Sequence, residues 1–133
     1  EDYLARQPGK RLHLLQGVHL LHALATGIES IHRAGEYHGD LHSENIIIRR
    51  LGLSYELKFL DLFHLGKANR DNKTGDICDA IRIFYDAIGG MKRYKHHPQA
   101  IKHICCGLKR SLIVKKFRTA SALRVHLETM TWR

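Results

Sequence analysis

Residues 12–34 carry an apolar repeat that restricts the fold more than any other feature of the sequence. Apolar side chains recur there in steps of four and three residues, which is the spacing of one face of an α-helix. The repeat consists of Leu14, Val18, Leu21, Ala25, Ile28 and Ile31. It predicts a long helix, amphipathic or largely buried, that Gly35 is expected to end as a C-cap residue.

The rest of the chain predicts more helices and one hairpin. Residues 46–48 are β-branched and residues 55–59 alternate with period two, which is typical of two short strands. Asp76 is a candidate N-cap for a helix that Gly89 and Gly90 close, after a polar stretch at residues 69–74. Further helices are expected over residues 1–7, 98–110 and 120–129, with an apolar turn at 112–114. The fold class is therefore mainly α with a small β-hairpin.

Composition excludes several classes of chain. With 133 residues, 44% of them hydrophobic, and only two prolines, the sequence suits one globular domain rather than a linker or a low-complexity segment. Polar residues interrupt its longest apolar stretch, so no membrane span is expected. We expect a soluble, cytoplasmic protein. The chain begins at Glu1 without a leader pattern, so it is expected to be an excised piece or to continue upstream.

Cysteines and histidines predict no metal or disulfide framework. Cys78, Cys105 and Cys106 form no C-x-x-C pair, so buried, small hydrophobic side chains in a reducing compartment are the favoured interpretation. His19 and His22 are three residues apart on the first long helix, but no third ligand accompanies them at a fixed spacing. A surface or half-buried pair is favoured over a metal site.

Positive charge gathers in the C-terminal third of the chain. Residues 1–90 hold 11 Lys and Arg against 12 Asp and Glu, whereas residues 91–133 hold 11 against one, a net charge of +10. A polyanion or an acidic protein face is a candidate partner for residues 91–133. Solvated helix faces are the alternative, favoured over nucleic-acid binding because aromatic stacking partners are lacking.

The most informative stretch is residues 38–46, HGDLHSENI, together with residues 59–63, FLDLF. They resemble the catalytic loop of the protein-kinase-like superfamily, H-x-D-L-x-x-x-N, and its metal-binding Asp. The order of elements fits as well: a helix, the loop, a hairpin with the second Asp at its exit, and then a helix. The resemblance extends over nearly all of the chain, and the last helix is similar to that of bacterial Ser/Thr kinases. It implies the C-terminal lobe of a kinase, with residues 1–133 as one lobe.

The resemblance also implies roles for individual residues. Asp40 matches the catalytic carboxylate, which orients the acceptor hydroxyl and takes its proton. Asn45 and Asp61 match the ligands of the Mg²⁺ that accompanies ATP. His42 stands where protein kinases usually have Lys, and H-G-D-L-H is common among aminoglycoside phosphotransferases and other atypical kinases. Two further positions match residues that support the catalytic loop, namely His38 and Asp76.

Several departures from the family pattern narrow the expected function. The chain has no G-x-G pair and no strand Lys before residue 38, so an ATP-binding N-lobe of the same protein is expected upstream. Phe63 replaces the glycine after the metal-binding Asp, and Gly39 replaces the Arg that pairs with a phosphorylated activation loop. Only 14 residues separate Asp61 from Asp76, with no A-P-E among them. Peptide recognition of the usual kind is expected to be poor.

These observations predict an ATP-dependent phosphotransferase that moves the γ-phosphoryl group to a hydroxyl acceptor on a protein or a small molecule. A Ser/Thr protein kinase relative with a shortened activation segment is the first candidate. The alternatives are an aminoglycoside-phosphotransferase-like kinase and a pseudokinase C-lobe that acts as a binding module. A helical domain unrelated to kinases, with Asp40 and Asn45 as capping residues, is a further alternative.

Overall fold

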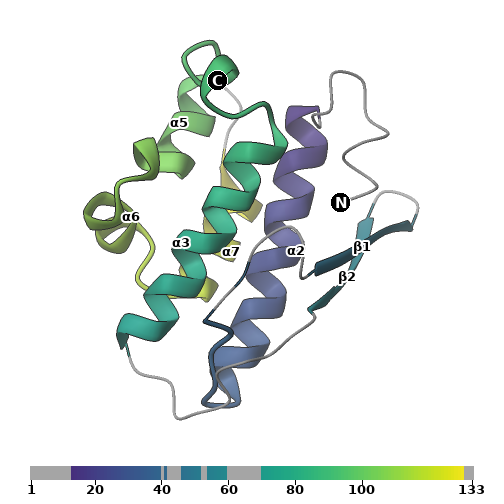
Figure 1. The fold of residues 1–133 in the computed structure, drawn as a ribbon, viewed down its shortest axis with the longest axis vertical. Coiled ribbons are helices and arrows are strands. Elements are labelled where there is room, and N and C mark those ends of the chain that lie inside the picture. The colour runs from purple at the N-terminus through teal and green to yellow at the C-terminus, as the bar shows by residue number, and fades with distance from the viewer. Residues whose placement is uncertain (1–12, 40, 42–45, 52–53, 60–69, 131–133) are drawn as a thin grey trace.

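A computed structural model describes residues 13–39, 41, 46–51, 54–59 and 70–130 (Figure 1). This part of the chain is mainly helical, as predicted. Its helices are α2 (Leu14–Arg33), α3 (Arg70–Ala87), α4 (Met91–Tyr94), α5 (Gln99–Cys105), α6 (Arg110–Lys116) and α7 (Ala120–Thr129), with a 3₁₀ turn η3 (Cys106–Leu108). Two strands, β1 (Ile46–Leu51) and β2 (Ser54–Phe59), lie between α2 and α3 in the chain.

Local signals begin and end α2. The Gln16 side chain accepts a hydrogen bond from the His13 backbone at 3.1 Å, which uses one of the N–H groups that a helix start leaves unpaired. At the other end Gly35 has φ +81° and the N–H of Glu36 donates to the carbonyl of Ile31 at 3.1 Å. This is the Schellman arrangement, in which glycine follows the C-cap residue. The C-cap is therefore Ala34, one residue before the predicted position, and Gly35 follows it.

The core lies between α2 and the helices packed on it. Figure 1 shows α2 and α3 side by side, with α7 behind them, and α2 contacts both. Four of the six residues of the predicted stripe are buried in this core, and the other two, Leu14 and Ile31, are half-buried. Leu20 and Leu24 are buried as well, so α2 is covered over a wider face than the stripe indicates. On α3 the buried apolar side chains include Ile77, Ile81 and Phe84. Helices α5 and α6 cover another face of α3.

Gly17 allows the close approach of α2 and α3. A Cβ atom at this position would collide with Ile88 Cγ2 and would lie 3.2 Å from Phe84 Cε1. Both neighbouring side chains are fully buried and cannot move into solvent.

Gly17→Ala is therefore expected to destabilise the chain, by about 1–3 kcal/mol, because overpacking a filled core forces side chains off their rotamers. Urea unfolding measures the change. Gly75→Ala on α3 is a suitable control, since among the described residues a Cβ there meets only the end of the Arg110 side chain, at 3.9 Å. Equal stabilities of Gly17→Ala and the wild type would contradict this close packing.

Strands β1 and β2 pair antiparallel, with Ile46 opposite Phe59 and Leu51 opposite Ser54. Strand β2 lies against α2. The two residues that would join the strands, and the side chains of both strands, lie outside the described part of the chain. The expected short helix at residues 1–7 lies outside it too.

Two sequence predictions about helices are wrong, one helix was missed, and one predicted helix is shorter than expected. Asp76 does not begin a helix, because α3 starts at Arg70 and includes most of the polar stretch expected to be a loop. Residues 112–114 belong to α6 rather than to a turn. Helix α4 was not expected, and the predicted helix at 98–110 ends earlier, as α5 and η3. The helix expected at 120–129 is confirmed as α7.

In the described part of the chain, no helix has the length and apolar character needed to cross a bilayer.

Candidate functional site

The carboxylate of Asp76 holds the backbone that leads to Asp40. Asp76 lies in α3, with none of its surface exposed. Its Oδ2 accepts a hydrogen bond from the N–H of His38 at 2.8 Å, and its Oδ1 accepts one from the N–H of Gly39 at 2.9 Å. Because both carboxylate oxygens are used, the two residues before Asp40 are tied to a buried residue of α3.

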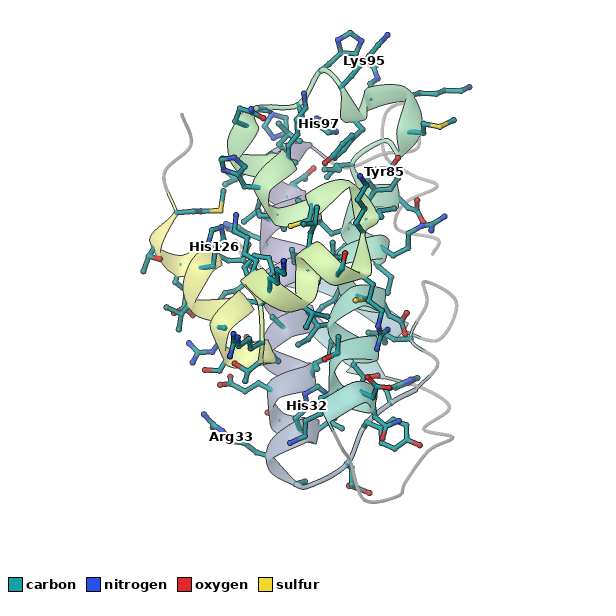
Figure 2. The ribbon with its side chains drawn as sticks, turned by 90° about the vertical axis from the view of Figure 1, so that its left-hand side faces the viewer. His32, Arg33, Tyr85, Lys95, His97 and His126 are labelled. Atoms are coloured by element: carbon teal, nitrogen blue, oxygen red, sulfur yellow. The ribbon has the colours of Figure 1, made fainter. Side chains whose placement is uncertain are left out.

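A histidine from α2 completes the surroundings of this carboxylate. His32 Nε2 lies 2.9 Å from Asp76 Oδ2, and only 9% of the His32 side chain is exposed. His32 lies in the last turn of α2, and Figure 2 shows it low on that helix, close to α3. The carboxylate thus links α2, α3 and the loop at residues 38–39.

Hydrogen bonding decides the ionisation of Asp76. Burial raises the pKa of its carboxyl group, but the hydrogen bonds from His32 and from the loop backbone outweigh burial, so the pKa lies below its ordinary value of 3.8. All three contacts favour the charged form, which accepts hydrogen bonds at both oxygens.

This lowered pKa makes one part of the folding stability depend on pH. Since the folded state binds the Asp76 proton less tightly than the unfolded state, the contribution is complete above the unfolded pKa of about 3.9 and is lost as the pH falls through the lower folded value. We expect the difference in unfolding free energy between wild type and Asp76→Asn to shrink as the pH is lowered from 6 to 3. Urea unfolding across that range measures it, and a difference that stays constant would contradict the assignment.

The residues that flank Asp40 have defined positions. Gly39 has φ +86°, a backbone conformation that favours glycine. His38 is fully buried, and Leu41 is 4% exposed within the hydrophobic core. The chain is therefore held on both sides of Asp40.

Four predicted site residues lie outside the described part of the chain. These are Asp40, His42, Asn45 and Asp61. The structure brings His38 and Asp76 together, whereas the roles of the other four residues rest on the sequence motif alone. Among the described residues there is no group of three or more His, Cys, Asp or Glu side chains that could hold a metal ion.

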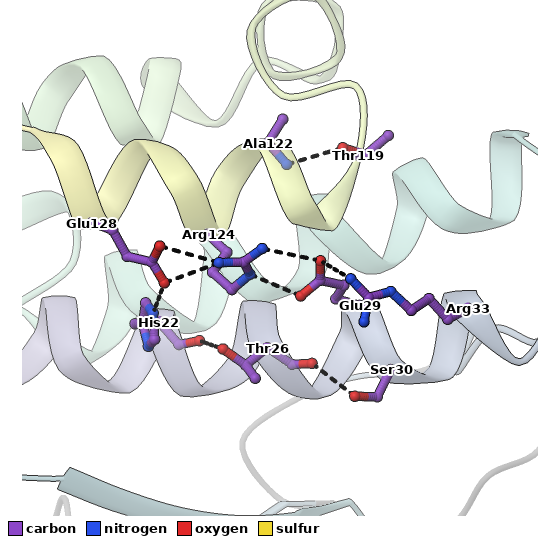
Figure 3. A network of polar contacts seen from close by, with 9 residues as sticks. All are labelled: His22, Thr26, Glu29, Ser30, Arg33, Thr119, Ala122, Arg124 and Glu128. Carbon is purple, nitrogen blue, oxygen red and sulfur yellow. Dashed lines mark hydrogen bonds and ion pairs between the residues drawn. The ribbon is translucent and has the colours of Figure 1, made fainter.

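A polar network between α2 and α7 was not expected from the sequence (Figure 3). Glu29, which is 8% exposed, accepts hydrogen bonds from Arg124 Nε at 2.8 Å and from Arg33 Nη2 at 3.2 Å. Arg124 also donates to Glu128, which His22 Nε2 contacts at 2.7 Å. The hydrogen bonds from Arg124 lower the pKa of Glu29 and outweigh the opposite effect of burial. The network locks α7 against α2.

The sequence predictions missed Glu29 and His32, although the spacing of both residues carried a signal. Glu29 follows the stripe residue Ala25 by four positions, and His32 follows Ile28 by four. One helical turn after a buried position, a polar side chain is placed at the edge of the buried face, where it needs a partner.

Cysteines in the described region are not activated. Burial raises the pKa of the Cys105 thiol to about 12, and burial also raises the pKa values of Cys78 and Cys106. All three are free, and only Cys105 is fully buried. They therefore remain protonated thiols at neutral pH.

Comparisons with known proteins add no relative. No protein-family model, no curated protein and no solved structure matches this chain.

Proposed function

We propose that this chain is the C-terminal lobe of a kinase-like phosphotransferase, which moves the γ-phosphoryl group of ATP to a hydroxyl acceptor. The observation that carries the proposal is the contact of the Asp76 carboxylate with the backbone N–H groups of His38 and Gly39. A buried, charged carboxylate is costly, and here it is used to fix two loop residues directly before Asp40. Such fixing suits a reaction that depends on positioning.

The proposed roles follow the motif residues. Asp40 orients the acceptor hydroxyl and takes its proton, and His42, two positions later in the sequence, belongs to the same catalytic motif. Asn45 and Asp61 would hold Mg²⁺, because amide and carboxylate oxygens are the ligands that this ion prefers. When bound, the ion supplies neutralisation of phosphate charge. His38 and Asp76 support the loop, and an N-lobe of the same protein binds the rest of ATP.

The start of α3 favours a small acceptor as the second candidate. Because α3 begins at Arg70, only residues 62–69 separate Asp61 from that helix. A kinase that acts on peptides needs a docking platform for an extended chain in this region, and eight residues leave little length for one. A small-molecule hydroxyl compound needs no such platform, whereas a Ser/Thr acceptor would have to be docked elsewhere.

Turnover assays with the full-length protein test the proposal. We expect Mg²⁺-dependent ATP consumption that requires an acceptor from a panel of Ser/Thr peptides, small hydroxyl compounds and the protein itself. Residues 1–133 alone should show negligible turnover and weak MgATP binding by calorimetry, since the chain has no glycine-rich phosphate loop. Micromolar MgATP affinity with turnover by these residues alone would contradict the C-lobe assignment. Full-length protein that binds partners but turns over no ATP would favour the pseudokinase alternative.

We also propose an anionic partner for the basic residues 91–133, and a cytoplasmic location for the protein. Exposed cations in this segment include Lys92, Lys95 and Lys109. Interactions between such exposed charges are screened beyond about 8 Å at physiological ionic strength. Binding of an acidic partner is therefore expected to weaken steeply in a salt series. Affinity that does not change with salt would argue against this partner class.

A further inference from the structure

A cleft of about 400 Å³ opens where the end of α2, the first turn of α3 and the start of α7 meet. Figure 2 shows His32 and Arg33 near this end of α2. The volume lies in the range of small-molecule sites. The cleft is lined by Glu29, His32, Arg33, Lys73, Arg118, Thr119, Ala120 and Ser121.

Positive charge exceeds negative charge in this cleft. Arg33, Lys73 and Arg118 come from three separate parts of the chain, and Glu29 is the single carboxylate among the described residues that line the cleft. Glu29 is already neutralised from outside the cleft, because Arg124 donates to both of its oxygens, at 2.8 and 3.3 Å. Within the described part of the chain, neither Lys73 nor Arg118 has an ion-pair partner. Two or three positive charges are thus left for a ligand.

The start of α7 adds hydrogen-bond donors to the same wall. Thr119 caps the helix by accepting from the N–H of Ala122 at 2.9 Å. Ala120 and Ser121, which line the cleft, are in the first turn, where the backbone N–H groups of a helix have no acceptor within the helix. These groups favour an anion and would repel a cation.

Charge, size and composition together select the ligand. A surplus of at least two positive charges suits a dianion better than a single carboxylate. Arginine forks match the oxygens of a phosphate group, and lysine adds a point charge. Among the described residues that line the cleft there is no Phe, Tyr or Trp on which a nucleobase could stack.

We propose that this cleft binds a phosphate group, either free or as the monoester of a small molecule. The ligand would sit between Arg33, Lys73 and Arg118, with the first turn of α7 behind it. This inference does not rest on the proposed phosphotransfer, because it uses none of the motif residues.

Titration of the protein with inorganic phosphate and with glycerol 3-phosphate tests the proposal. Binding is measured by calorimetry and by ³¹P NMR, in the absence of nucleotide. We expect saturable binding of both probes to the whole protein. Lys73→Gln and Arg118→Gln should each weaken it by about tenfold or more, as expected for losing a hydrogen bond to a charged group. Tighter binding of glycerol 3-phosphate would indicate a monoester ligand, and equal binding would indicate that the cleft recognises phosphate alone.

Arg82→Gln is a matched control, because it removes one exposed positive charge that lies outside both the cleft and the basic residues 91–133. It should change affinity by less than about twofold. Circular dichroism would show that all three variants fold. Equal weakening in the control and the cleft variants would overturn the proposal, since general attraction to a basic protein would then explain the binding. The absence of saturable binding would overturn it as well.

Discussion

Asp40→Asn in the full-length protein is expected to lower kcat by about 10²–10⁴-fold while the affinity for ATP changes little. The range is that of a positioned general base, and the proposed role places Asp40 beside the acceptor rather than the nucleotide. Steady-state kinetics with the best acceptor, together with ATP binding by calorimetry, measure the two effects separately.

Asp61→Asn should give a different result, the loss of metal-dependent nucleotide binding, because its proposed role is to hold Mg²⁺. Asp86→Asn, on an exposed part of α3, is the control and should keep full activity. If Asp40→Asn and Asp61→Asn both kept full activity, the pseudokinase or unrelated-domain alternative would be favoured.

Asp76→Ala is expected to have the largest effect on stability, a loss of about 3–5 kcal/mol. It removes a buried acceptor from two backbone N–H groups and from His32, and each buried group left unpaired costs about 1–3 kcal/mol. Guanidinium unfolding measures the loss.

Asp86→Ala removes an aspartate from the same helix, where its carboxylate is 58% exposed and pairs with Arg82 at 3.3 Å. It should cost less than about 1 kcal/mol, as exposed ion pairs do. Similar unfolding midpoints for Asp76→Ala and Asp86→Ala would show that the loop contacts contribute little.

Helices with regularly spaced apolar residues were the elements that the sequence predicted most accurately. The repeat in α2 is regular and is followed by glycine, and the bounds predicted for both α2 and α7 are nearly correct. The start of α3 was placed too late because Asp76 is of a residue type that is preferred at N-caps. Its carboxylate instead accepts from the loop at residues 38–39, a tertiary contact that no local pattern reports.

The contacts of the candidate site were harder to predict from the sequence, because they too join residues that are far apart in the chain. The motif predicts which residue types meet in the loop, but His32 reaches Asp76 across a separation of 44 positions. Glu29 and Arg124 are also far apart in sequence, and each alone reads as an ordinary charged residue. Packing determines which distant polar residues become partners, and the local spacing of residues in one sequence does not show that packing.

The pairing of α2 with α7 also has a consequence for synthesis of the chain. Glu29 and Arg124 are 95 positions apart, so a ribosome that adds about 5–20 residues per second needs roughly 5–20 s between them. During that interval the face of α2 that α7 later covers has no native partner. A nascent chain of this protein therefore depends on its neighbours, on chaperones or on transient contacts to shield that face until α7 emerges.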